Sequence, residues 1–68
     1  MENRINKLRG YRTMLDLTQQ DMAELLGISR RTYQDKESGT SKLSLTEAIK
    51  IVEEFEKRGL SVSVAEFV

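Results

Sequence analysis

Two adjacent arginines, Arg30 and Arg31, follow Ser29 at the point where a polar helical segment begins. A guanidinium can donate two parallel hydrogen bonds to O6 and N7 of guanine, or to the oxygens of a phosphate. Two cations at a helix N-terminus oppose the helix dipole, so this position favours an external anion as their partner. Gln34 shares their helix face. The alternative is a solvated surface on which Arg31 pairs with Asp35.

Composition argues against enzyme chemistry. The chain has neither cysteine nor histidine, so thiol nucleophiles, imidazole bases and the usual zinc ligands are absent. The remaining candidates for catalytic groups are four carboxylates between residues 47 and 56. They have no base, nucleophile or metal partner nearby in the sequence pattern. We interpret them as a solvated helix face: Glu47, Glu53, Glu54 and Glu56. We therefore expect a protein that is not an enzyme and that binds no metal or other cofactor.

The length of 68 residues predicts a single domain over residues 1–68, in which residues 60–68 form a tail. Eleven Lys and Arg residues balance eleven Asp and Glu residues, which argues against a basic coat over the whole surface but leaves room for a local patch. The N-terminus lacks the apolar core of a signal peptide, and no apolar run approaches the roughly 20 residues that span a bilayer. We expect a cytoplasmic protein with no membrane partner and no small-molecule substrate.

The spacing of apolar residues predicts two helices in the first part of the chain. Residues 3–15 carry one apolar stripe, formed by Ile5, Leu8, Tyr11 and Leu15. Thr18 is a good N-cap for a second helix, because Asp21 stands at its third position. This helix ends at Gly27 and presents three residues inward: Met22, Ala23 and Leu26.

Ile28 and Ser29 alone separate Gly27 from a third helix, over residues 30–37, that Ser29 caps. Two helices joined by so short a turn form a helix-turn-helix unit, in which the second helix can project from the body. A fourth helix begins after Ser44, with a capping box, and ends before Gly59. Its predicted inner face consists of Leu45, Ala48, Ile49, Val52 and Phe55.

The tail, residues 60–68, alternates apolar residues with serine, which favours an extended segment. The alternative is one more helical turn over residues 63–66, capped by Ser63. We expect the apolar tail residues to pair across a two-fold axis and so to form a homodimer, whereas folding back onto the fourth helix is the alternative. These residues are Leu60, Val62, Val64, Phe67 and Val68.

The stretch LTQQDMAELLGISRRTYQDKESG resembles the helix-turn-helix of the lambda-type phage repressor and Cro (XRE-like) family. The resemblance covers residues 8–55. Its most specific parts are Arg12, Leu17-Thr18-Gln19, Ala23, Gly27-Ile28-Ser29, and Glu37 with Gly39. It implies an all-α, compact bundle of four or five helices whose third helix enters the major groove of DNA.

The resemblance also implies roles for single residues. Contacts with base edges fall to Arg30, Arg31, Gln34 and Asp35, and contacts with phosphates fall to Gln19, Ser29, Lys42 and Arg12. Arg12 and Glu37 correspond to a family pair that links the first helix to the end of the third. Asp35 has two open roles, because it could accept a hydrogen bond from cytosine N4 or only orient Arg31.

Two residues of the third helix are expected to differ in their burial. Tyr33 stands at an apolar family position, so we expect it to fill the core with its hydroxyl at the rim. Lys36 departs from the family pattern, because this position is usually apolar. We expect either a less firmly seated third helix or a lysine whose stem extends from the core toward DNA.

These observations predict a sequence-specific protein that binds double-stranded DNA in the major groove. We expect a homodimeric transcriptional regulator that acts as a repressor by occupying a palindromic operator. The alternative function is a protein-interaction module, such as an antitoxin with secondary DNA binding, and the neutral charge and apolar tail favour it.

Overall fold

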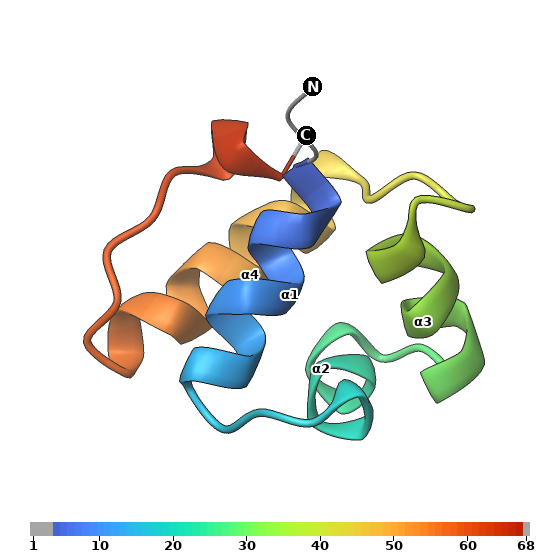
Figure 1. The fold of residues 1–68 in the computed structure, drawn as a ribbon, viewed down its shortest axis with the longest axis horizontal. Coiled ribbons are helices and arrows are strands. Elements are labelled where there is room, and N and C mark those ends of the chain that lie inside the picture. Colours follow the sequence, from blue (N-terminus) through green and yellow to red (C-terminus); the bar gives the residue numbers. More distant parts are fainter. Residues whose placement is uncertain (1–3, 68) are drawn as a thin grey trace.

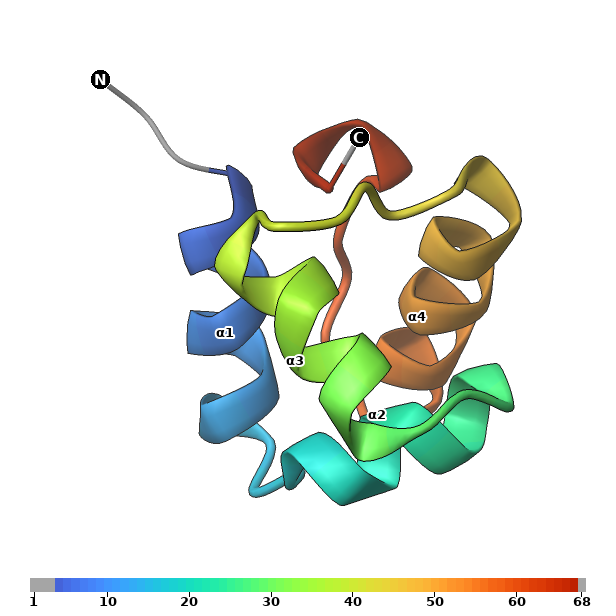
Figure 2. The same cartoon turned by 90° about the vertical axis from the view of Figure 1, so that its right-hand side faces the viewer.

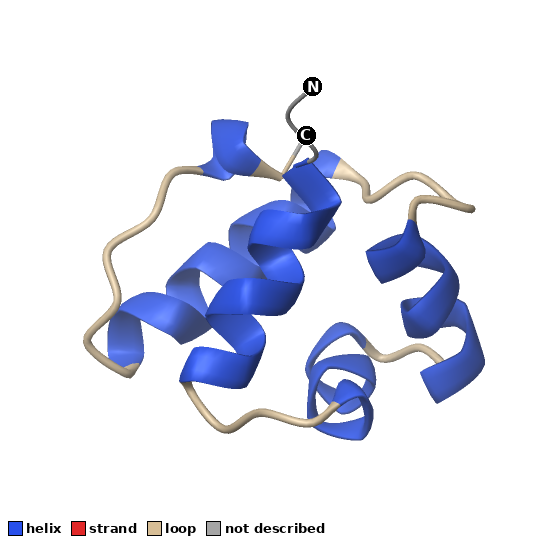
Figure 3. Cartoon of the chain, in the orientation of Figure 1, coloured by secondary structure: helices blue, strands red, loops and turns tan. Residues whose placement is uncertain are grey.

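The computed structural model describes residues 4–67, with side chains from residue 7 onward. This range contains helices and no strand, which confirms the expected all-α class (Figure 3). Its elements are α1 (Arg4–Met14), α2 (Gln19–Leu26), α3 (Arg30–Ser38), α4 (Leu45–Lys57) and the short 3-10 helix η1 (Val64–Glu66). The side chain of Ile5, expected in the apolar stripe of the first helix, and Val68, expected at the dimer contact, lie outside the described part.

The helices surround one core (Figure 1). Turned by a quarter turn, the molecule shows α3 in front, α1 and α4 on either side of it, and α2 below (Figure 2). α2 packs against both α3 and α4, and α3 also packs against α1. The segment after α4 returns along the side of the molecule opposite α3 and ends at η1, which packs against α1 and α4 (Figure 1).

The structure confirms the predicted N-caps. They could be predicted because each depends only on residues that are close together in the chain. The Thr18 hydroxyl accepts a hydrogen bond from Asp21 N at 3.0 Å, and the Asp21 carboxylate accepts one from Thr18 N at 2.9 Å. Ser44 and Glu47 repeat this capping box at α4. Such caps satisfy backbone groups that a helix start leaves free, and each contributes about 1 kcal/mol.

Aromatic rings tie the tail to the core. The rings of Tyr11, Phe55 and Phe67 meet edge to face, with centroids between 6.1 and 6.4 Å apart. Such pairs contribute about 0.5 to 1.5 kcal/mol beyond the area they bury. The remaining large side chains that are fully buried are Leu8, Met22, Tyr33 and Ile51.

The predicted inner face of α4 was wrong at two positions. Leu45 and Ile49 are 60% and 42% exposed, whereas Ile51, which the pattern did not select, is fully buried. Ala48, Ile51 and Phe55 form the buried stripe. At 100° per residue Ile49 stands about 120° away from Phe55, so both cannot face the same neighbours.

The preference for an extended tail is correct for residues 60–63 and wrong for residues 64–66. Ser63 caps η1 and forms a capping box with Glu66. Phe67 is only 2% exposed, and Leu60, Val62 and Val64 pack against the core of their own chain. The chain thus adopts the fold-back alternative, and burial of Phe67 leaves its ring unavailable to a partner in this conformation.

Candidate nucleic-acid interface

A tight turn sets the direction of α3 relative to α2. Gly27 ends α2 with φ at +70°, in the left-handed region where a Cβ would be strained. Ile28 N then donates a hydrogen bond of 3.0 Å to Ala23 O. Ala23 is fully buried, and its small side chain allows α2 and α3 to approach closely. The turn therefore holds α3 in front of the body with one face exposed (Figure 2).

The exposed surface of α3 has two rows of side chains. Arg30, Gln34 and Ser38 follow one another at intervals of four and line a groove next to α1. Arg31 and Asp35 form the other row, and their side chains approach to 3.6 Å. The Arg31 side chain is 83% exposed, so this ion pair contributes little to stability and leaves the guanidinium accessible.

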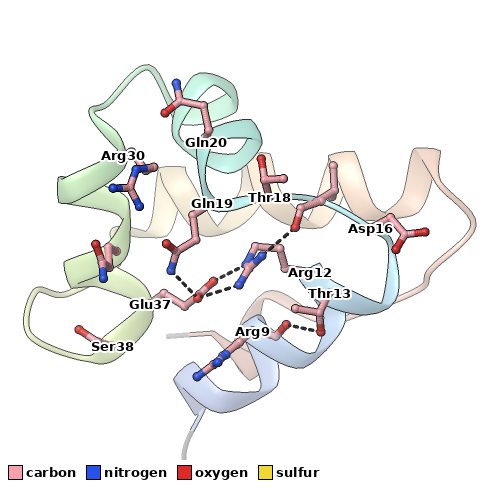
Figure 4. Close-up of a pocket in the computed structure, with 12 residues that line it drawn as sticks. Arg9, Arg12, Thr13, Asp16, Thr18, Gln19, Gln20, Arg30, Glu37 and Ser38 are labelled. Carbon is pink, nitrogen blue, oxygen red and sulfur yellow. Dashed lines mark hydrogen bonds and ion pairs between the residues drawn. The ribbon is translucent and has the colours of Figure 1, made fainter.

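The groove has a volume of about 870 Å³ and lies between α1, the start of α2 and α3 (Figure 4). Four residues with expected DNA contacts meet in it: Arg12, Gln19, Arg30 and Gln34. Arg31, Asp35, Ser29 and Lys42 are not part of its lining.

Glu37 joins the three helices beneath this groove. Arg12 donates to both carboxylate oxygens of Glu37, with Nε at 2.6 Å and Nη2 at 3.1 Å. Gln19 Nε2 donates to Glu37 Oε1 at 3.1 Å, and the Tyr33 hydroxyl donates to Glu37 Oε2 at 2.8 Å. Arg12 Nη1 also donates to Leu17 O at 2.7 Å. The network connects α1, α2 and α3 through one carboxylate (Figure 4).

The network changes the titration of its members. Burial acts to raise the pKa of Glu37, but hydrogen bonds from Arg12, Tyr33 and Gln19 outweigh it and leave this pKa below its ordinary value. The bond to Glu37 raises the pKa of Arg12. Burial, followed by the bond to Glu37, raises the pKa of Tyr33. Arg12 and Glu37 therefore stay ionised, and Tyr33 stays neutral, throughout the neutral range.

Ser29 and Lys42 occupy the two ends of the α3 region. The Ser29 hydroxyl caps α3 by accepting a hydrogen bond from Thr32 N at 3.1 Å. It also donates to Thr32 Oγ1 at 2.8 Å. Lys42 is exposed in the loop between α3 and α4. Neither position conflicts with the phosphate contacts expected for them.

Lys36 does not extend toward the exposed face of α3, and α3 is not loosely seated. Its ammonium pairs with Glu47 Oε1 of α4 at 3.2 Å and donates to Lys42 O at 2.9 Å. Glu47 is consequently not a simple solvated residue, and Glu54 pairs with Arg58 at 2.9 Å. An ammonium is too costly to bury alone, and here a carboxylate and a carbonyl provide its partners. Both partners lie outside α3, so the spacing of residues within α3 does not reveal them.

Five residues that line the groove were not selected from the sequence: Arg9, Thr13, Asp16, Gln20 and Ser38. A signal for Arg9 existed, because it stands three residues before Arg12 on the same helix face. A signal for Ser38 existed as well, since it continues the spacing of Arg30 and Gln34.

Two further kinds of site receive no support from the described residues. None of the helices within residues 4–67 is long and apolar enough to cross a bilayer. The same part of the chain contains no group of three acidic side chains placed to hold a metal ion.

Comparisons with known proteins agree with this geometry. A family model described as helix-turn-helix matches residues 8–60. An uncharacterized HTH-type transcriptional regulator of Methanocaldococcus jannaschii is 46% identical over 50 residues, which cover 74% of this chain and 76% of that protein. No solved structure matches the chain at a significant level. The matched residues 8–60 include the whole lining of the groove and all of α2, α3 and α4.

Proposed function

The chain belongs to the helix-turn-helix family and is a DNA-binding regulator of transcription, and from this premise we propose that it is a repressor acting by operator occupancy. The observation that carries the proposal is the exposed surface of α3, where Arg30 and Arg31 stand free of the core. A bound domain of this kind blocks access to the DNA beneath it. Because its ligand is DNA, we assign the protein to the cytoplasm.

We assign base reading to α3 and backbone positioning to the surrounding residues. Arg30, Arg31, Gln34 and Asp35 contact base edges in the major groove, where a bidentate arginine discriminates by about 1 to 3 kcal/mol. Phosphates are bound by residues at the start of α2, at the N-cap of α3 and in the loop after α3: Gln19, Ser29 and Lys42. Phosphate contacts supply affinity that depends on salt, whereas base contacts supply specificity.

We further propose that two copies bind a palindromic operator. Two-fold symmetry would place two α3 helices in successive major grooves, about 34 Å apart. Leu60, Val62 and Val64 are only partly buried, but their segment lies on the side of the molecule opposite α3, so a contact through it would point the two α3 helices away from each other.

The test is selection of bound sites from a random pool of duplexes, followed by a gel shift of the selected duplex at physiological salt with random competitor. A palindromic consensus that is retained against competitor supports the operator proposal. A consensus without symmetry would overturn the dimer, and recovery of no consensus would overturn sequence-specific binding. Transcription from a promoter that contains the selected site should fall when the protein is added, and a rise would exclude repression.

A protein-interaction module is the second candidate, and one observation favours it. Leu45 and Ile49 lie four residues apart on α4 and expose 60% and 42% of their surface. Neighbouring exposed apolar side chains are a feature of docking surfaces. Under this alternative, micromolar protein would retain no duplex specifically in the same gel shift.

A further inference from the structure

Helix α1 contributes a second arginine to the groove, Arg9, and no role has been assigned to it. Arg9 lines the groove from α1, and its side chain is exposed. Among the side chains of residues 7–67, neither a carboxylate nor another polar group holds its guanidinium. In Figure 4 the nitrogen end of Arg9 lies on the α3 side of α1, in front of the groove.

Arg12 differs from Arg9 in its burial, in its hydrogen bonds and in having a carboxylate as partner. Its side chain is 10% exposed, and three of its N–H groups point to Glu37 and to Leu17 O. The carboxylate of Glu37 also neutralises its charge at contact distance. An external phosphate therefore meets little net positive charge at Arg12, although this arginine lines the same groove.

The opposite wall of the groove suits the same ligand. Arg30 and Ser38 stand on α3 across from Arg9, and Gln19 lies between the two walls (Figure 4). Asp16 is at the end of the groove away from Arg9 and Arg30. With Arg12 and Glu37 cancelling, the two remaining arginines make one end of the groove positive and Asp16 makes the other negative. A polyanion that crosses the groove is thus drawn to the end where Arg9 stands.

We propose that Arg9 binds a backbone phosphate of the DNA duplex, and that Arg12 is a positioning residue which fixes α3 and Gln19 through Glu37. This inference rests on the proposed function, since it assigns one more contact to the same DNA-binding surface. The ionic contact that α1 makes with a phosphate is thus assigned to the exposed Arg9. The buried Arg12 keeps α1, α2 and α3 in their relative positions. Such a contact carries no base preference.

The test compares Arg9→Gln with Lys57→Gln on the duplex obtained by selection. Both variants remove one exposed cation and keep a long polar side chain, but Lys57 lies in the last turn of α4 and does not line the groove. The dissociation constant of the wild type and of each variant is measured at several salt concentrations. Circular dichroism and thermal unfolding verify that both variants are folded.

For each bound chain, Arg9→Gln should reduce the slope of log K against log salt by about 0.9 and weaken binding roughly eightfold at about 0.1 M salt. The loss should be equal for matched and mismatched duplexes. Arg9→Lys should restore the slope, and Lys57→Gln should behave as the wild type. If the wild type binds specifically and Arg9→Gln has the same slope and affinity, the inference is wrong and the function stands. If the wild type retains no duplex, the proposed function itself falls.

Discussion

Lys36 and Glu47 form an ion pair of 3.2 Å that joins α3 to the first turn of α4. Both side chains are mostly buried, with 14% and 18% of their surface exposed. Lys36 also donates to Lys42 O, so the same ammonium holds the loop between the two helices. The charge of this largely buried lysine thus has its partner on the neighbouring helix.

A double-mutant cycle should detect this pair. Lys36→Ala and Glu47→Ala should show a coupling energy of about 0.5 to 1 kcal/mol in urea unfolding, because the two charges are shielded from solvent. Glu54 and Arg58 provide the matched control, since their pair joins α4 only to its own C-cap residue and is more exposed. We expect about 0.3 to 0.5 kcal/mol for that pair. Equal coupling energies in both cycles would show that the ion pair between α3 and α4 stabilises the fold no more than an exposed pair does.

Removal of the charge of Glu37 should strongly destabilise the fold. Glu37→Gln leaves the guanidinium of Arg12 buried without its counter-ion, which costs about 3 kcal/mol or more. Urea unfolding followed by circular dichroism measures the loss. Glu53→Gln, at an exposed position of α4, should change stability by less than about 0.5 kcal/mol. A Glu37→Gln variant as stable as this control would mean that the buried pair does not hold the three helices together.

The same carboxylate predicts how stability depends on pH. The pKa of Glu37 is lowered in the folded chain, against about 4.3 in the unfolded chain. Its contribution is therefore fully present above pH 4.3 and is lost as the pH falls through the lower, folded value. The pKa values of Asp21, Glu47 and Glu66 are also lowered, so they act in the same direction.

The measurement is the unfolding free energy between pH 7 and pH 2.5. It should be level near neutrality and fall below about pH 4.3, and the fall should be smaller in Glu37→Gln than in the wild type. A wild type that gains stability on acidification would contradict the sign of these shifts.

Local features of this chain could be predicted from its sequence, and features decided between helices could not. Thr18, Ser29 and Ser44 cap their helices through residues three positions away, so their roles are visible in any short stretch. The burial of Ile51 rather than Ile49 is different, because both are apolar and only the placement of α2 and η1 selects between them. Every Lys36 contact described above likewise lies on another element of the fold.

The candidate site follows the same division. The polar row of α3 is evident from the position of Arg30 and Arg31 after a short turn. The groove itself requires α1 to lie beside α3, which the sequence pattern does not specify, and so Arg9 could not be separated from Arg12. Their different burial arises from Glu37, a partner 25 residues after Arg12 in the chain.

Substitutions on the two sides of the interface should separate base reading from backbone positioning. Arg30→Ala and Arg31→Ala should relax the preference at particular operator positions, because each removes a bidentate donor. Gln19→Ala and Lys42→Ala should weaken matched and mismatched sites alike, and Lys42→Ala should lower the salt slope by about one unit. Site selection repeated with each variant gives the preferences. Unchanged preferences in both arginine variants would remove α3 from the role of reader.

The tail provides the final prediction, because its two candidate roles lead to opposite results. Phe67 closes the aromatic cluster with Tyr11 and Phe55, and the Tyr11 hydroxyl donates to Glu66 at 2.7 Å. Phe67→Ala should lower the free energy of unfolding by about 3 kcal/mol or more, through lost burial and the cavity it leaves. A domain of this size has only about 3 to 10 kcal/mol in total, so deletion of residues 60–68 should leave it largely unfolded.

Circular dichroism and sedimentation of the full-length and truncated proteins at matched concentration test this expectation. Val62→Ala is the control for a partly buried tail residue, and it should cost about 1 kcal/mol. A truncated chain that remains folded and monomeric, beside a full-length protein that sediments as a dimer, would mean that the tail serves the partner. Loss of helical signal on truncation would instead show that the core cannot close without Phe67, and the contact between two copies must then be sought on a surface other than this ring.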